Sequence, residues 1–148
     1  MQNSDAMALS AALLAAAGGL TQRIHEGVVA RGFEGLRPAH GFAFTRLAPD
    51  GATVTDLAAH LGVTKQAASQ LVDELVRKGY AERRPHPADA RARLVVLTER
   101  GRACTRAAEE AAAEAVRGWT DVIGEGEVRV LYGLLARVAP NGPVRPSW

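Results

Sequence analysis

Residues 53–76 read TVTDLAAHLGVTKQAASQLVDELV and contain the signals for two short helices with a sharp turn between them. Thr53 can cap a helix that begins at Val54, and Asp56 lies three residues on, where it can return a bond to the backbone of the cap. Gly62 permits the positive φ that a sharp exit requires, and Thr64 can cap the next helix. The stretch therefore predicts a helix-turn-helix.

The second of these helices has one apolar and one polar face. Helical spacing turns Ala68, Leu71, Val72, Leu75 and Val76 toward the core. The opposite, outward face of this helix is polar. A face of this kind can lie in a major groove of DNA, where Gln and Lys bond base edges and Ser bonds bases or phosphate. An ordinary solvated helix face is the alternative. The outward residues are Lys65, Gln66, Ser69, Gln70 and Asp73.

A basic hairpin is expected directly after this helix. The strands are predicted at Tyr80–Arg84 and Arg91–Leu97, joined by a stiff tip at Pro85–Ala90. Asp89 is close enough in sequence to hold Arg91 by a salt bridge. A guanidinium held at such a tip suits a narrow minor groove, although surface solubility is the simpler reading. The arginines that crowd the hairpin are Arg83, Arg84, Arg91 and Arg93.

The basic charge is concentrated in this middle segment. The chain has 148 residues and a net charge of +2, yet residues 77–106 hold nine of the 18 Lys and Arg side chains and only three Asp or Glu. A focused basic segment is typical of a polyanion site, and a solvated charged surface is the alternative. The composition, 47% hydrophobic and 23% charged, is that of a folded globular domain rather than a disordered chain or a membrane protein.

Helices are expected on both sides of the helix-turn-helix. One long helix is predicted from Met7 to about Gly32, with Gly18-Gly19 as the place where it would bend, and a second at Pro38–Leu47. Two more are predicted from Cys104 to about Trp119 and at Glu125–Val138, and a loose tail at residues 140–148. These flanking helices carry more apolar surface than a winged helix of about fifty residues can cover, which favours a dimer.

The apolar stretch Ala6–Leu20 is judged too short to span a membrane, since a spanning helix needs about 18 consecutive apolar residues. No basic segment precedes it, so a signal peptide is not expected. The single cysteine excludes an intramolecular disulfide framework and a cysteine-rich zinc site. We therefore expect a cytoplasmic protein.

Residues 56–75, then Lys78-Gly79-Tyr80, PADARA at 87–92 and LTERG at 97–101, resemble the MarR family of bacterial winged helix-turn-helix regulators. The resemblance covers about residues 53–102. It implies an obligate homodimer that binds a pseudo-palindromic operator, base contacts from the exposed part of Thr64–Gln70, and Arg91 in the minor groove with Asp89 positioning it. It also implies phosphate contacts from Thr53, Thr55 and the adjoining helix start. Two-fold symmetry would place two recognition helices about 34 Å apart, one turn of duplex.

The fold is accordingly expected to be mostly α (α+β), as a single domain of residues 1–148. Residues 36–98 would form the winged helix-turn-helix with its two-stranded wing. Residues 1–35 and 99–139 would form the homodimerisation lobe, and residues 140–148 the tail.

A small aromatic or phenolic effector is implied by the family, in the crevice between the dimer helices and the DNA-binding lobe. Ordinary core or interface positions are the alternative for each residue that should line this crevice. Cys104 is interpreted as a buried inert thiol, and the histidines have no metal-ligand spacing, so no metal or cofactor is expected. The candidate lining residues are His25, His40, Phe42, Phe44 and Trp119.

Two other classes of protein are alternatives to a DNA-binding regulator. An enzyme is disfavoured because the chain has no Gly-rich phosphate loop, nucleophile elbow, paired-carboxylate motif or zinc motif. A winged-helix protein-interaction module without DNA binding is the remaining alternative, and the basic residues of the second helix and the hairpin argue against it. The expected function is a regulator, more specifically a repressor, that binds double-stranded DNA.

Overall fold

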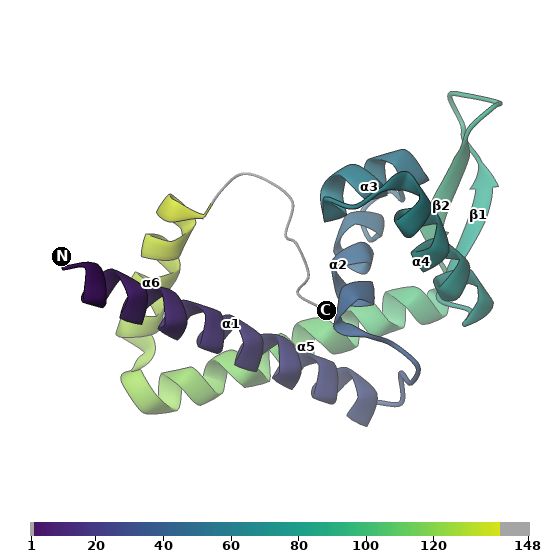
Figure 1. Ribbon diagram of the computed structural model, residues 1–148. Helices are drawn as coiled ribbons and strands as arrows, with labels where there is room; N and C mark the ends of the chain where they lie inside the picture. Colours follow the sequence, from purple (N-terminus) through teal and green to yellow (C-terminus); the bar gives the residue numbers. More distant parts are fainter. Residues whose placement is uncertain (1, 140–148) are drawn as a thin grey trace.

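The computed structural model describes residues 2–139, which form six helices and one two-stranded sheet (Figure 1). A long pair of crossing helices runs along the base of the molecule in this view, and the helix-turn-helix with its projecting hairpin lies above one end of the pair. The order of elements confirms the expected winged helix. The elements are α1 (Asn3–Ala30), α2 (Pro38–Leu47), α3 (Val54–Leu61), α4 (Lys65–Arg77), β1 (Ala81–Pro85), β2 (Arg93–Leu97), α5 (Glu99–Ile123) and α6 (Glu125–Val138).

Local capping bonds fix the helix-turn-helix as the sequence predicts. The Thr53 hydroxyl accepts from the Asp56 amide at 3.1 Å, and the Asp56 carboxylate accepts from the Thr53 amide at 3.3 Å. Gly62 ends α3 with φ of +65°, in the left-handed region that favours glycine. The Thr64 hydroxyl accepts from the Ala67 amide at 3.1 Å and so caps α4.

One hydrophobic core joins the helix-turn-helix to α2, β2 and the start of α5. The apolar face of α4 is buried in it as predicted, with Val76 only partly covered. Tyr80 lies at its centre, fully buried, with its ring against Phe33 and Phe44 and its hydroxyl donating to the Glu34 carbonyl at 3.1 Å. Its largest buried members also include Leu47, Leu57, Leu61, Val72, Leu75 and Val95.

The two strands of the wing begin later than expected. The antiparallel register runs from Ala81 opposite Leu97 to Pro85 opposite Arg93, and Ala52 adds a single bridge to Val95. Tyr80 is outside β1 because its amide donates to the Leu75 carbonyl at 2.9 Å and closes the end of α4. Residues 91 and 92 likewise belong to the tip rather than to β2.

Helices α2 and α6 have the predicted bounds, whereas α1 and α5 are longer than expected. Helix α1 begins at Asn3 instead of Met7, ends at Ala30, and runs through Gly18 and Gly19 without a break. Helix α5 begins at Glu99 instead of near Cys104, because the Thr98 hydroxyl accepts from the Gly101 amide at 3.1 Å and caps it. Residues 140–148, predicted to be a loose tail, lie outside the described residues.

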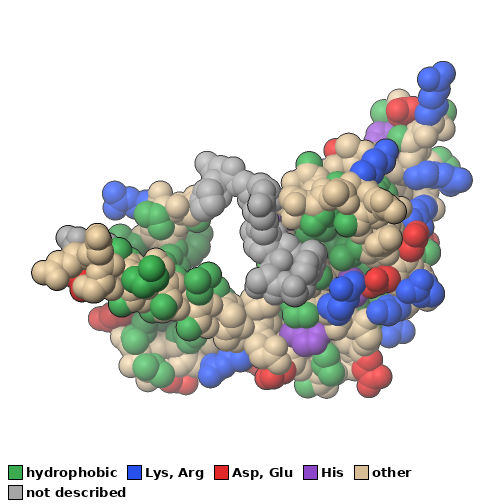
Figure 2. Space-filling view, viewed as in Figure 1, with side chains coloured by type: hydrophobic (Ala, Val, Ile, Leu, Met, Phe, Trp, Pro, Cys, Tyr) green, Lys and Arg blue, Asp and Glu red, His purple; other side chains and the backbone are tan. Residues whose placement is uncertain are grey.

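The end of the molecule formed by α1 and α6 presents apolar side chains on its surface (Figure 2). By length and composition α1 is apolar enough to span a membrane, with a mean hydropathy of 1.3 over 18 residues and none of them buried within the chain. The apolar stretch Ala6–Leu20 is thus part of a longer apolar helix, a property that core helices of soluble proteins share. The exposed large apolar side chains are Met7, Leu9, Leu13, Leu14, Val29, Val122, Ile123, Val130, Tyr132, Leu134 and Val138.

Candidate nucleic-acid interface

The outer face of α4 is open to solvent, as its sequence pattern predicts. Lys65, Gln66 and Gln70 are exposed, and Ser69 is half-buried. Thr64 is also exposed, at the N-terminus of the helix, where free backbone N–H groups favour an anion such as phosphate. Side chains of these types can bond base edges, and the start of such a helix can lie against the backbone of a duplex.

The two threonines of α3 are placed differently. Thr53 uses its hydroxyl oxygen as the cap acceptor for Asp56, and its side chain is half-buried. Its O–H proton is still able to donate to a phosphate oxygen. Thr55 is exposed in the first turn of α3. Both are therefore at the helix start that the sequence analysis assigned to phosphate contacts.

The wing tip is braced by bonds within residues 86–92. The His86 amide donates to the Ala92 carbonyl at 3.2 Å, and the His86 ring nitrogen Nδ1 accepts from the Ala88 amide at 3.1 Å. His86 was not singled out from the sequence, although its position between Pro85 and Pro87 is the signal that could have found it. The tip is therefore an ordered platform for its arginine rather than a loose loop.

Asp89 positions Arg91 through the backbone and not by the expected salt bridge. Its carboxylate Oδ1 accepts from the Arg91 amide at 2.9 Å. The expectation of a side-chain ion pair was wrong because the Asp89 side chain closes a local turn two residues on, as aspartate commonly does. The Arg91 guanidinium is left exposed.

The four hairpin arginines fall into two pairs. Arg83 bonds Asp73 of α4, and Arg84 bonds Glu82 beside it on β1. Asp73 therefore ties α4 to the wing and does not serve as a free polar group on the outer face. Within residues 2–139, Arg91 and Arg93 lie beyond 4.0 Å of any carboxylate, and so does Lys65. Their positive charges are not neutralised inside the chain. Figure 2 shows Lys and Arg side chains gathered at the wing end of the molecule.

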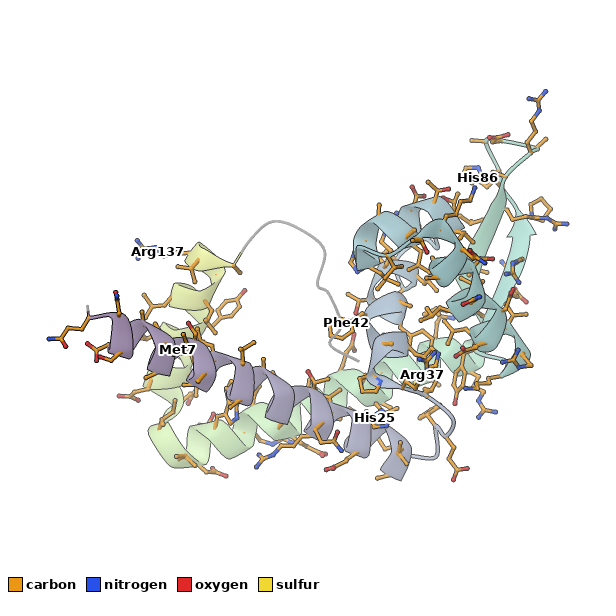
Figure 3. All side chains as sticks on the ribbon, viewed as in Figure 1. Met7, His25, Arg37, Phe42, His86 and Arg137 are labelled. Carbon is orange, nitrogen blue, oxygen red and sulfur yellow. The ribbon has the colours of Figure 1, made fainter. Side chains whose placement is uncertain are left out.

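A groove of about 580 Å³ lies between α1, α2 and α5. His25, Phe42 and Phe44 line it, as the sequence analysis proposed, and Figure 3 labels His25, Phe42 and Arg37 in this region. His40 and Trp119 are not among its lining residues. The lining is mainly apolar, with polar groups from Thr21, His25, Arg37, Thr45, Thr105 and Glu109.

His40 is instead held in the core by two hydrogen bonds. Its side chain is 0% exposed, and Nδ1 accepts from the Arg37 amide at 2.8 Å. An amide can only donate, so Nδ1 carries no proton, and Nε2–H donates to Glu74 Oε2 at 3.0 Å. Arg37 Nη2 donates to the same oxygen at 2.8 Å. Neither Arg37 nor Glu74 was predicted, since their contact joins residues 37 positions apart.

Lowering the pH from 7.5 to 5.5 should reduce the free energy of unfolding through His40. Burial lowers the pKa of His40 below 6.5, and Arg37 and Lys78 lower it further, while the hydrogen bond and charge of Glu74 oppose the shift. The unfolded chain then binds a proton where the folded chain does not, so stability falls as the pH drops below about 6.5 and toward the lowered pKa. Hydrogen bonds lower the pKa of Glu74 below 4.5 and that of Asp56 below 3.8. Protonation of these two carboxyls therefore reduces stability only at more acidic pH.

Urea unfolding at pH 7.5, 6.5 and 5.5 measures this effect. In His40→Asn the amide oxygen can replace Nδ1 as acceptor without titrating, so the slope of stability with pH should flatten. His60→Asn, at a half-exposed histidine of α3, is the matched control. Equal slopes for the wild type and His40→Asn would contradict the assignment.

Cys104 is buried, with 1% of its surface exposed, and burial raises the pKa of its thiol to about 11. A thiol that stays protonated and covered is a poor nucleophile, which supports the reading of an inert cysteine. Within residues 2–139 no group of three His, Cys, Asp or Glu side chains could hold a metal ion.

The family model for the MarR family matches residues 42–92, which span the helix-turn-helix and the wing tip. An uncharacterized protein of Mycobacterium tuberculosis is 37% identical over 94 residues, which are 64% of each chain. This chain thus spans 64% of the length of the curated relatives that it matches.

Solved structures extend the likeness to nearly the whole chain. Wild-type MarR from E. coli is 25% identical with a TM-score of 0.71, covering 89% of this chain and 97% of MarR. A probable transcriptional regulator from Pseudomonas aeruginosa is 26% identical with a TM-score of 0.69, covering 88% and 96% of the two chains. A mutant E. coli MarR complexed with operator DNA is 24% identical with a TM-score of 0.73, covering 92% and 96%, and it shares the fold. With the helix order and wing described above, these matches show that the chain has the MarR-like winged-helix fold and that its residues 42–92 are similar to the MarR family of transcription regulators.

Proposed function

We propose that this protein is a sequence-specific regulator of transcription that binds double-stranded DNA and acts in the cytoplasm as a repressor. The supporting observation is the exposed polar face of α4 beside a braced wing tip whose Arg91 and Arg93 have no carboxylate partner within residues 2–139. A duplex would neutralise these charges, with α4 in the major groove and the tip in the flanking minor groove. A MarR homologue complexed with operator DNA supports this class of partner.

The DNA contacts are assigned to two groups of residues. Lys65, Gln66, Ser69 and Gln70 read base edges from α4, with Thr64 at its start. Thr53 and Thr55 contact phosphates. Arg91 enters the minor groove with Asp89 fixing its backbone, and the flanking hairpin contacts come from Arg83, Arg84 and Arg93.

The same proposal includes a homodimer formed by α1, α5 and α6. The exposed apolar side chains of α1 and α6 lie at the end of the molecule away from the wing, where a second copy would cover them (Figures 1 and 2). A patch of this extent on a monomer would be costly in water. Residues 1–35 and 99–139 would form the dimerisation lobe, and residues 36–98 the DNA-binding lobe, within a single domain.

A small aromatic or phenolic effector would bind in the groove that His25, Phe42 and Phe44 line. Apolar walls and a few polar groups are typical of a small-molecule site, and 580 Å³ is within the usual size range of about 300–1,000 Å³. Such a ligand would weaken DNA binding by favouring a different spacing of the two recognition helices. His40 and Trp119 are not part of this proposed site, because neither lines the groove.

Fluorescence anisotropy with labelled DNA tests the proposal. The duplex is taken from upstream of the protein's own gene, and a scrambled duplex is measured beside it at two salt concentrations. We expect selective binding of one dimer per site, weakened steeply by salt because neutralised phosphates release counterions. A folded dimer that binds neither duplex at low salt would favour the protein-interaction module instead.

A further inference from the structure

The amino groups on the side chains of this protein are few. Of its 18 Lys and Arg residues only Lys65 and Lys78 are lysines, and the rest are arginines. A lysine amine can lose its proton and then attack an activated acyl group, whereas a guanidinium stays protonated in proteins. Acylation of side-chain amines is therefore confined to two residues, and the arginine-rich wing is insensitive to it.

Lys65 is the lysine on the proposed DNA-binding face. It is the first residue of α4, and its side chain is exposed. Within residues 2–139 no carboxylate lies within 4.0 Å of its amine. Its neighbours one turn later on the helix, Ala68 and Ser69, carry no charge. A small reagent can therefore reach the Lys65 nitrogen without first displacing an ion-pair partner.

Lys78 is tied to the backbone instead. It follows the last residue of α4 and is half-buried. Its Nζ donates a hydrogen bond to the Gly35 carbonyl, and a Cβ at Gly35 would lie 3.6 Å from Lys78 Cε. Hydrogen bonds from an ionised donor are stronger than those between neutral groups, so an attack by this nitrogen costs a contact. The two lysines thus differ in access and in bonding, at opposite ends of the same helix.

We propose that Lys65 is a modification site for acyl phosphates and that its acylation weakens DNA binding. The unprotonated Nζ attacks the carbonyl carbon of the acyl phosphate, so that a C–N bond forms and the C–O bond to phosphate breaks. Inorganic phosphate leaves with the electron pair of that bond, and the proton lost from Nζ goes to water. The product is a neutral amide. The inference rests on the proposed function and adds a covalent route of regulation to it.

Acylation changes what Lys65 offers to a duplex. The ammonium carries a positive charge and three N–H donors, whereas the amide is neutral and keeps one N–H. A phosphate or a guanine edge near the start of α4 loses its cation, and a two-fold dimer loses it at both half-sites. Arg91 and Arg93 are unchanged by the reagent. The expected result is therefore weaker binding rather than its complete loss.

Acetyl phosphate tests the modification site in protein free of DNA. The full chain is incubated with the reagent, and mass spectrometry of its peptides follows the two lysines over time. We expect Lys65 to be acetylated about tenfold faster than Lys78, because only Lys78 must give up a hydrogen bond from a charged donor. Cys104 is buried, with a thiol pKa of about 11, and should not compete.

The urea-unfolded chain is the matched control for this rate. Unfolding frees Lys78 from Gly35, so the two rates should become equal to within about twofold. A Lys78 that reacts as fast as Lys65 in the folded protein would overturn the modification site. A preference for Lys65 that persists unchanged in urea would also overturn it, because the fold would then not be its cause.

Duplex affinity tests the effect of the modification. Acetyllysine is placed at position 65 or at position 78 during translation, which gives uniformly modified protein. We expect acetylation of Lys65 to weaken binding about tenfold and acetylation of Lys78 to leave it within about twofold, since only Lys65 is a proposed DNA contact. Lys65→Arg cannot be acylated, so acetyl phosphate should not change its affinity from the untreated value. An equal loss in treated Lys65→Arg would assign the effect to another group.

The two measurements fail separately. The acylation rates do not depend on DNA, so fast and fold-dependent acetylation of Lys65 establishes the modification site even if the unmodified protein binds no duplex. That absence of binding would overturn the proposed function and the regulatory effect together. Selective acetylation with unchanged duplex affinity would overturn the regulatory effect alone and leave the proposed function standing.

Discussion

Arg91→Ala is expected to weaken binding to the operator by about 1–3 kcal/mol per half-site, and by about twice that for a dimer with two wings. The Arg91 guanidinium is exposed and has no carboxylate partner within residues 2–139, so its removal costs no internal contact. Its backbone amide keeps the bond to Asp89, because that bond does not involve the side chain. The free energy of unfolding should therefore stay at its wild-type value.

Anisotropy titrations at matched salt measure this loss. Arg84→Ala is the comparison and should lose less affinity, since Arg84 is also a proposed hairpin contact but is already paired with Glu82. Gln66→Ala gives a second comparison, because a base contact alters the preference between sequences while a phosphate contact weakens all of them alike. Unchanged affinity of Arg91→Ala would show that the wing tip does not enter the DNA.

Gly101→Ala is expected to destabilise the fold by about 3 kcal/mol, the upper part of the usual cost of overpacking a core. A Cβ at this position would lie 2.1 Å from the Tyr80 backbone oxygen and 3.2 Å from Leu97 Cβ. Because that oxygen accepts from the Thr98 amide at 3.0 Å, the clash also strains the start of the wing. No side-chain rotation can relieve a contact between a Cβ and a backbone atom.

Thermal or urea unfolding at matched protein concentration tests this, since the stability of a dimer depends on concentration. Gly41→Ala is the matched control: it lies inside α2, its Cβ meets nothing within 4 Å, and it should gain up to about 1 kcal/mol from helix propensity. If the two alanine variants unfolded alike, the close approach at Gly101 would be unimportant for stability.

Local signals predicted the local structure well. The bounds of α2 and α3 follow from Pro38, the Thr53–Asp56 pair and Gly62, all of which act within one turn of the helix ends. The predicted strands began one or two residues too early. The Tyr80 amide donates to the end of α4 instead of pairing in β1, and the Arg91 amide donates to the Asp89 carboxylate instead of pairing in β2. Sequence patterns indicate that a strand is present, but they do not show to which of several acceptors each backbone N–H donates.

Contacts between distant residues could not be read from the sequence. The bond between Arg83 and Asp73 depends on how the wing lies against α4, and the bond between Arg37 and Glu74 depends on how α2 lies against α4. Charge counting identified the basic segment but not that two of its four hairpin arginines are internally paired. His40 was named as a groove residue because its segment was expected to line the crevice, whereas the fold turns its ring into the core.

The junction between the wing and α5 has a mechanical consequence. A single residue, Thr98, separates β2 from α5, and its hydroxyl donates to the Gly79 carbonyl at 2.6 Å while accepting from the Gly101 amide. Because this junction is short and hydrogen-bonded on both sides, the hairpin is rigidly attached to the start of α5. We therefore expect a small tilt of α5 to displace the wing tip by more than it displaces the junction, and Arg91, the proposed minor-groove residue, to move with the tip.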